Sequence, residues 1–396
     1  MSTFTPSTFI ESSFTESEER LELRRQVARL SSRYGREWFT EKARAGEKTT
    51  ELWLEIGKAG YLGANLPEEY GGSGGGIGDI AAVCEELAAQ GCPLLMMVVS
   101  PAICGTVIAR YGTEAQKQKW LPGIADGTAT MAFAITEPDA GTNSHNITTT
   151  ARRDGAAWVL KGQKIYISGV DEAENVLVVA RAEDSRTGKL KPCLFVVPTD
   201  STGFEFTAIP MEIVSPELQF QVFIDDVRLS ADALVGDEDG GLVQLFAGLN
   251  PERIMAASFS TGMARYALEK ASAYAKERTV FKAPIGSHQA VAHPLAQAHI
   301  ETELARLMTQ KAAALCDAGD DMGAGEAANM AKYAAAEAAC HAVDAAVQTH
   351  GGNGITQEYG MAGLLVAARA GRIAPVSREM ILNFVAMHSL GLPKSY

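Results

Sequence analysis

The pattern of hydrophobic positions divides this chain into three regions, and the pattern of the first region is helical. Near the start, Val27, Leu30 and Trp38 fall at the spacing of one helix face, and residues 101–111 also have a helical pattern. Glycine and proline separate the predicted helices. The pattern predicts an all-helical N-terminal region covering residues 1–128.

The middle of the chain changes to short runs rich in Val, Ile, Phe and Tyr, with turn residues such as Asp154 and Gly155 between them. The runs lie at residues 158–160, 176–180, 193–197, 204–209 and 220–224. Runs this short, separated by turns, are typical of an antiparallel sheet. The sequence predicts a small β-sheet domain over residues 129–240.

Helical periodicity returns after Gly240 and continues to the end of the chain. Ile254, Met263 and Ala271 fall on one face, and residues 326–349 form an alanine-rich stretch. Several of these segments are long enough for a bundle. We therefore expect an α+β protein with a C-terminal helical bundle over residues 241–396.

Charge and cysteine content exclude several classes of protein. The 396 residues carry a formal charge of −13, which argues against a nucleic-acid partner because phosphate backbones require a basic face. The six cysteines show no CxxC spacing, so neither a metal site nor a disulfide framework is predicted. They read as buried, reduced thiols.

The first residues predict neither export nor a membrane anchor. No Lys or Arg precedes Arg20, so the basic start of a signal peptide and the arginines of a transit peptide are missing. No apolar run approaches the roughly 20 residues of a membrane span. We expect a mobile N-terminal tail and a soluble, cytoplasmic protein.

One segment carries a chemical signal of its own. Residues 136–142 read Thr-Glu-Pro-Asp-Ala-Gly-Thr, and residues 162–168 read Gly-Gln-Lys-Ile-Tyr-Ile-Ser. A polar loop joined to a strand that ends in an aromatic and a hydroxyl suits a planar cofactor such as a flavin, because the loop offers donors and the aromatic covers one face. Without a cofactor, residues 136–142 would be a simple turn at Pro138 and residues 162–168 an ordinary strand.

Four further stretches, residues 60–72, 250–253, 277–281 and 348–354, stand in the order and spacing of one family. With residues 134–168 they resemble the acyl-CoA dehydrogenases over nearly the whole chain. The resemblance implies FAD as cofactor, an acyl-CoA substrate, an electron-transferring flavoprotein as acceptor, a role in fatty acid metabolism and a homo-oligomer, usually a tetramer in that family.

The resemblance also assigns FAD contacts, with one group donated across a subunit interface. From the loop and its strand these are Phe133, Ala134, Ile135, Thr136, Gly141, Thr142, Tyr166 and Ser168. From the C-terminal region they are Arg278, Phe281, His288, Gln289, Gln348, Gly351, Gly352 and Ser377. The alternatives are a solvated charge at a helix end for Arg278 and a helix C-cap for the glycines.

The implied reaction needs a carboxylate that removes the α-proton of the acyl thioester while a hydride leaves the β-carbon. Most family members place this glutamate at the position of Pro375 here, or of Arg378 by an ungapped count. Neither is a carboxylate. In a subset resembling the isovaleryl- and long-chain enzymes the base precedes an arginine, which predicts Glu252 as the base, followed by Arg253. The alternative is an exposed pair in the first turn of a helix.

The substrate site has less support in the sequence. By resemblance we assign Thr142, Asn250 and Arg253 to substrate binding, with residues 94–99 and room left by Gly248 shaping the acyl pocket. Pro375 has no N–H to polarise the thioester carbonyl, which by analogy with oxyanion holes costs on the order of 10²-fold in rate. Two other functions stay open: a flavin-dependent enoyl-CoA reductase or oxidase, and a catalytically silent FAD-binding subunit.

Overall fold

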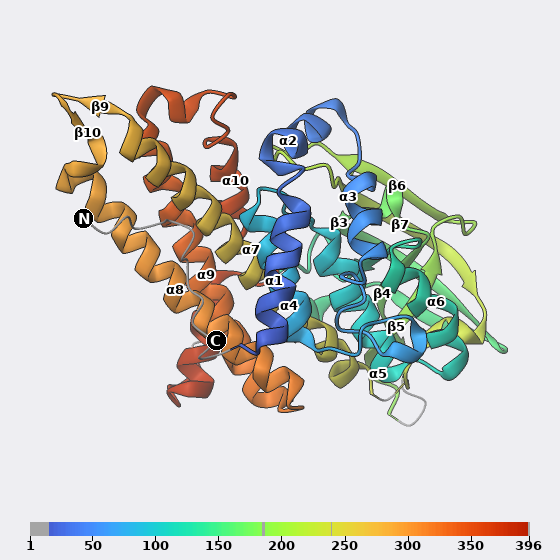
Figure 1. Cartoon of the computed structure of the whole chain (residues 1–396). Coiled ribbons are helices and arrows are strands. Elements are labelled where there is room, and N and C mark those ends of the chain that lie inside the picture. The colour runs from blue at the N-terminus through green and yellow to red at the C-terminus, as the bar shows by residue number, and fades with distance from the viewer. Residues whose placement is uncertain (1–15, 184–186, 239, 395–396) are drawn as a thin grey trace.

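The computed structural model describes residues 16–183, 187–238 and 240–394 (Figure 1). The expectations for the first fifteen residues, a mobile tail and no leader, lie outside this part of the chain. Within it, no helix combines the length and the apolar character that crossing a membrane requires.

The N-terminal region is helical, as predicted. Its elements are α1 (Glu18–Ser31), α2 (Gly35–Ala45), α3 (Thr50–Lys58), α4 (Ile77–Ala89), the π-helical η2 (Val98–Gly105), α5 (Thr106–Tyr111) and α6 (Glu114–Asp126). Thr113 begins α6 with a reciprocal cap, since its hydroxyl accepts from Gln116 N while the Gln116 side chain accepts from Thr113 N. Helix α4 is buried along almost its whole length and forms the centre of this region.

The middle region is a sheet in the order β6-β7-β3-β2-β4-β5-β8, with β1 beside β4. Its strands are β1 (Met131–Ala134), β2 (Thr150–Asp154), β3 (Ala157–Ser168), β4 (Asn175–Glu183), β5 (Leu190–Pro198), β6 (Phe204–Ile209), β7 (Gln219–Leu229) and β8 (Leu234–Val235). The sheet is mainly antiparallel, as predicted, but β4 pairs in parallel with both β1 and β2.

The C-terminal region is a bundle of long helices on the side of the molecule opposite the sheet (Figure 1). It comprises α7 (Gly241–Glu277), α8 (Gln289–Asp317), α9 (Asp321–His350), η7 (Gly351–Ile355), α10 (Gly363–Ala370), α11 (Arg378–Phe384) and η8 (Val385–Ser389). A short hairpin of β9 (Thr279–Val280) and β10 (Ala283–Pro284) projects from the end of α7. The buried face of α9 consists largely of alanines, which lets α7 and α8 approach it closely.

A buried ionic cluster fixes α7 against the N-terminal helices. Glu85 on α4 accepts from Arg24 of α1 at 2.9 Å, from Arg265 of α7 at 2.7 Å and from Arg306 of α8 at 2.6 Å. Buried charges are tolerated when they are paired and hydrogen bonded in this way. Four helices therefore share one polar junction, which α7 enters through Arg265.

Candidate active site

The loop after β1 is fastened to β3 by a buried ion pair. Lys164, which is fully buried on β3, donates from Nζ to Glu137 Oε1 at 2.9 Å and to the Ile135 carbonyl at 3.0 Å. Glu137 also accepts from the backbone N–H groups and the hydroxyls of Thr148 and Thr149 at 2.6–2.9 Å. The loop is thus preorganised by the chain itself.

The electrostatics of this pair follow from its burial. Burial alone would raise the pKa of Glu137, but the Thr149 hydroxyl and the Lys164 ammonium outweigh it and bring the pKa to about 2. Burial lowers the pKa of Lys164 to about 8 although Glu137 opposes this change. Both groups are therefore charged at neutral pH.

The predicted cofactor loop divides into a buried start and an exposed end. Phe133 and Ala134 are buried in β1, and the backbone of Glu137 and Ala140 closes a four-residue turn around Pro138. Ile135 and Thr136 are partly buried, whereas Gly141 and Thr142 are exposed. The turn at Pro138, which the sequence offered as an alternative to a cofactor loop, is therefore present. The exposed backbone N–H groups at its end are available as hydrogen-bond donors.

Tyr166 stands at an irregularity in β3, where the register with β7 shifts between Lys164 and Ile167. Its φ of 58° lies in the left-handed region, which bulky residues rarely adopt, and its side chain is 56 % exposed. The ring therefore projects from the sheet instead of following the strand. Ser168 is partly buried, and its hydroxyl accepts from Gln219 Nε2 at 2.9 Å.

Glu252 lies in the interior of α7, eleven residues after Gly241, so it is not in the first turn of a helix. The helix continues through Pro251, and the alternative of an exposed pair at a helix start is wrong. Glu252 is partly buried, and its carboxylate accepts no hydrogen bond from the described residues. Burial raises its pKa to about 7, against the opposing charges of Arg253 and Lys332.

The residues around Glu252 connect it with the strand before the cofactor loop and with the segment around Pro375. Burial raises the pKa of the Cys104 thiol well above the usual range, and the negative charge of Glu252 acts in the same direction. The same thiol donates to the Ala132 carbonyl of β1 at 3.5 Å, directly before the cofactor loop. On the other side, buried Lys332 of α9 donates to the Val376 carbonyl.

The two residues assigned to substrate binding beside Glu252 already have partners within the chain. Asn250 is buried and donates to the Asp321 carbonyl at 3.2 Å, at the start of α9. Arg253 donates from Nη1 to the Leu249 carbonyl at 3.3 Å and to Asn250 Oδ1 at 3.2 Å. Arg253 thus orders nearby polar groups of its own helix.

The segment around Pro375 is held to α9 by charges. Arg372 and Arg378 both pair with Glu337, at 2.6 and 3.2 Å, and Lys332 holds Val376 between them. The Ala374–Pro375 peptide bond is cis. Ser377 begins α11, and its hydroxyl accepts from Met380 N at 3.3 Å. Neither Pro375 nor Arg378, the two positions that match the family's usual base, is a carboxylate. Glu252 is therefore the candidate for the catalytic base.

The residues expected to reach across a subunit interface lie on the surface of this chain. Arg278 ends α7, and Phe281, with a φ of 50°, is 91 % exposed at the tip of the projecting hairpin. His288 and Gln289, at the start of α8, are exposed as well. Within one chain, Arg278 is an exposed charge at the end of α7, as the alternative to an FAD contact expected.

A second exposed group lies at the end of α9. Gln348 is exposed, and Gly351 forms the C-cap with a φ of 60°, as the alternative reading expected. A Cβ added at Gly351 or Gly352 would meet nothing within 4 Å. The missing side chains therefore leave open surface, where a ligand or another subunit could approach the backbone.

Gly248 does not leave room for an acyl chain, and this expectation is wrong. A Cβ at this position would lie 2.9 Å from Val107 Cγ2 and 3.0 Å from Ile103 Cγ2. The glycine lets α7 pack directly against η2 and α5. Residues 94–97 are partly or fully buried beside η2, where Leu95 N donates to Glu217 Oε1 at 3.0 Å.

Sequence reasoning missed Lys164, Lys332 and Cys104, which connect the parts of the site. Lys164 lies on β3 between Gln163 and Ile165, and Lys332 lies on the alanine face of α9. For Lys332 the available signal was a lysine on a helix face that is otherwise apolar, because lysine is almost never fully buried unless it is paired. Nothing in the local sequence marks Cys104.

The described residues contain no cluster of His, Cys, Asp and Glu that could hold a metal ion. Models of the N-terminal, middle and C-terminal domains of acyl-CoA dehydrogenase match residues 17–128, 132–222 and 239–390. The chain is 66 % identical to acyl-CoA dehydrogenase FadE12 of Mycobacterium tuberculosis, over 98 % of this chain and 100 % of the relative.

Solved structures agree with this assignment. A glutaryl-CoA dehydrogenase in complex with glutaryl-CoA superposes with a TM-score of 0.90 at 27 % identity, covering 96 % of this chain and 98 % of that one. A glutaryl-CoA dehydrogenase from Mycobacterium smegmatis in complex with FADH2 gives 0.89 at 27 % identity, with 98 % of both chains covered. The chain therefore belongs to the acyl-CoA dehydrogenase family, and it is an acyl-CoA dehydrogenase.

Proposed function

We propose that the chain binds FAD and dehydrogenates an acyl-CoA thioester between its α- and β-carbons, with Glu252 as the base. The observation that carries this proposal is a carboxyl on α7 that has no hydrogen-bonding partner among the described residues, with a pKa raised to about 7. A base with a pKa near the working pH combines availability with driving force for proton removal. Bound FAD supplies the acceptor for the β-hydride.

The donor set of the chain fits FAD. Tyr166 offers an exposed aromatic face beside a loop with exposed backbone donors, which suits a planar ring. Arg278 offers an exposed guanidinium, whose fork geometry matches a pyrophosphate. Gly351 and Gly352 leave the open approach that a dinucleotide needs. These features support the assigned FAD contacts.

The chain's own part in the reaction is the handling of one proton. Glu252 takes the α-proton of the thioester as the C–H bond breaks, the β-hydrogen leaves with its electron pair, and a C=C bond forms. Lys332 and Arg253 lower the pKa of Glu252 against the effect of burial. They keep it from rising so far that the carboxyl would stay protonated at neutral pH.

The thioester carbonyl needs hydrogen-bond donors while the α-proton leaves. Pro375 supplies none, because proline has no N–H. The next donor along the chain is Val376 N–H, which donates to no acceptor among the described residues. We infer that it replaces the missing donor, since Lys332 anchors the carbonyl of the same residue.

We also propose a homo-oligomer, because the predicted cofactor contacts on the hairpin and at the end of α9 are all exposed within one chain. Ile300, Leu304 and Leu307 support this proposal, since they form an apolar stripe on α8 at helical spacing and are 49–62 % exposed. An exposed apolar stripe is typical of an interface. A tetramer is the assembly expected from the family, with an electron-transferring flavoprotein as acceptor.

The class of activity is tested by mixing the FAD-loaded protein anaerobically with saturated acyl-CoA thioesters of different length and branching. Dehydrogenation predicts bleaching of the flavin by at least one thioester and slow reoxidation in air. Rapid reoxidation would indicate an oxidase. If no thioester bleaches the flavin and an enoyl-CoA reoxidises the chemically reduced protein, the direction is reductive. If no saturated thioester reduces the flavin and no enoyl-CoA reoxidises it, the protein is a catalytically silent FAD-binding subunit.

The base is tested by Glu252→Gln, which keeps the shape of the side chain and removes its basicity. We expect full FAD binding and at least a 10²-fold slower flavin reduction, the contribution typical of a general base. The control is Glu269→Gln, an exposed glutamate on the same helix, which should reduce at the wild-type rate. Equal rates in the two variants would contradict the assignment.

A further inference from the structure

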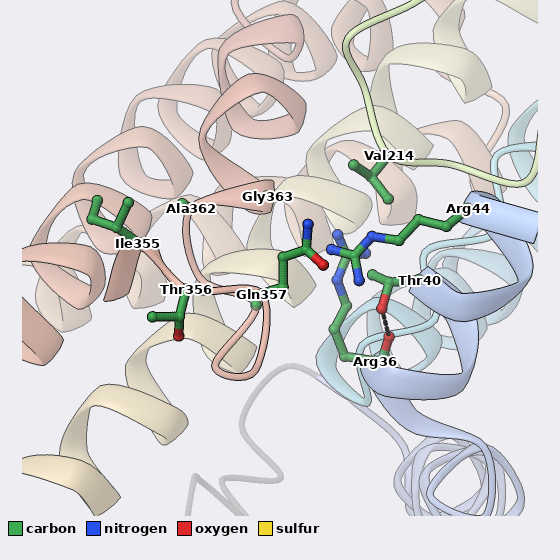
Figure 2. A pocket seen from close by; sticks show the side chains of 10 residues that line it. Arg36, Thr40, Arg44, Val214, Ile355, Thr356, Gln357, Ala362 and Gly363 are labelled. Carbon is green, nitrogen blue, oxygen red and sulfur yellow. Dashed lines mark hydrogen bonds between the residues drawn. The ribbon is translucent and has the colours of Figure 1, made fainter. Parts of the chain in front are cut away.

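A small pocket lies where three parts of the chain meet, and it is lined by the side chains of two arginines. One wall is the face of α2 that carries Arg36, Thr40 and Arg44, and the others are Val214, which precedes β7, and Gln357, which lies between η7 and α10 (Figure 2). The pocket has a volume of about 60 Å³. Figure 2 shows both arginine side chains extending towards Gln357.

Arg36 is a buried charge that pairs with no carboxylate among the described residues, although its guanidinium lies 5.4 Å from the centre of the Phe39 ring. It is only 6 % exposed, and neither Nε nor Nη2 has a hydrogen-bonding partner among the described residues. Burial lowers its pKa, and the second positive charge of Arg44 acts in the same direction. By contrast, Arg24 of α1 is buried to a similar degree but pairs with Glu16, Glu85 and Glu86.

No residue of the pocket can neutralise this charge. Its lining contains no carboxylate, and the Thr40 hydroxyl already donates to the backbone of its own helix. Guanidinium groups cannot lose their charge at any physiological pH, so Arg36 cannot become neutral as a buried lysine would. A buried charge without a partner is strongly unfavourable, which points to an anion from outside the described chain.

Size and charge select the kind of anion. A pocket of about 60 Å³ has space for a few water-sized groups, which matches a single tetrahedral oxyanion. Two guanidinium groups supply two positive charges and several N–H donors in fork geometry, which complement a phosphate group with its charge of about −1.5 to −2. Arg44 is exposed, so water can solvate its charge, but both guanidinium groups reach the pocket and together match the second negative charge that a phosphate carries and a carboxylate lacks.

We propose that Arg36 and Arg44 form a phosphate-binding pocket, lined by none of the residues assigned to acyl-CoA or FAD binding, that takes inorganic phosphate or the phosphate of a small monoester. The bound phosphate connects α2, the segment before β7 and the segment after η7. Its binding therefore stabilises the relative positions of the N-terminal helices, the sheet and the bundle.

The test is thermal unfolding of the FAD-loaded protein at constant ionic strength, with chloride replaced stepwise by inorganic phosphate and, in a second arm, by glycerol phosphate. A ligand that binds only the folded state raises the Tm in a saturable way. We expect this rise in the wild type. A larger rise with glycerol phosphate identifies the monoester as the ligand, and an equal rise identifies phosphate itself.

Two variants separate the pocket from other phosphate sites. Arg36→Met keeps the aliphatic stem, so we expect a Tm in chloride that is equal to or above the wild type and an apparent phosphate affinity at least tenfold weaker. Arg44→Gln should weaken the affinity severalfold with little change in chloride. Arg33→Gln, an exposed arginine that pairs with Glu55, is the control and should respond like the wild type.

Three results would overturn the proposal. They are a wild type that responds no more to phosphate than to chloride, an Arg36→Met protein that responds as strongly as the wild type, and an Arg36→Met protein that is much less stable in chloride. The last result would mean that a group from another subunit already neutralises Arg36.

Discussion

Flavin reduction by an acyl-CoA should depend on pH through the Glu252 carboxyl, because only the deprotonated form can accept the α-proton. Burial raises the pKa of this carboxyl from 4.5 to about 7. This change corresponds to roughly 3 kcal/mol in favour of the neutral form. The deprotonated fraction is then about 1 % at pH 5, about half at pH 7 and about 90 % at pH 8.

The assay is anaerobic stopped-flow reduction of the FAD-loaded protein at substrate concentrations below saturation. Under these conditions the second-order rate constant reports the protonation of the free enzyme. It should rise about tenfold per pH unit below 7 and level off above 8. A flat profile between pH 5.5 and 8.5 would refute the assignment of Glu252 as a buried base.

Lys332 provides a second perturbation of the same curve. Its positive charge lowers the pKa of Glu252, so Lys332→Met should move the midpoint to higher pH, by on the order of one unit. Lys311→Met removes an exposed lysine of α8 and is the control for the loss of one charge. An unchanged midpoint in Lys332→Met would mean that its charge does not act on Glu252.

Three further predictions concern stability and cofactor binding. Lys164→Met leaves a buried carboxylate unpaired and should cost about 3–5 kcal/mol in urea unfolding, whereas Lys161→Met, at an exposed pair with Asp225, should cost less than about 1 kcal/mol. Gly248→Ala forces a methyl against η2 and should destabilise the protein by about 1–3 kcal/mol in the same assay. Arg278→Gln should weaken FAD binding about tenfold in a titration of the apoprotein, and an unchanged affinity would remove Arg278 from the FAD site.

Much of the fold could be predicted from hydrophobic periodicity. The run at residues 204–209 coincides with β6, and the alanine-rich stretch became α9. The strand β2 was not predicted, because Arg152, Arg153 and Asp154 are exposed and give no apolar signal. The parallel pairing of β4 with β1 and β2 depends on the path of the chain between strands, which no local pattern contains.

In the candidate site, too, local sequence predicted some features, and others depend on contacts between distant parts of the chain. The resemblance predicted Glu252 as the base, but the pKa of its carboxyl follows from burial, which raises it, and from the charges of Arg253 and of Lys332, 80 positions further along the sequence, which lower it. The alternative for Glu252 and Arg253, an exposed pair in the first turn of a helix, is wrong because α7 passes through Pro251 and packs against α4 and α9. Local rules fail where tertiary packing overrides them.

The central claim is that Glu252 removes the α-proton, and it can be measured without hydride transfer. An acyl-CoA with no β-hydrogen, such as 3,3-dimethylbutanoyl-CoA, is incubated with the FAD-loaded protein in D2O, and deuterium at the α-carbon is followed by mass spectrometry. We predict rapid exchange with the wild type and with Glu269→Gln, and exchange at least 10²-fold slower with Glu252→Gln. Exchange by Glu252→Gln at the wild-type rate would contradict the account.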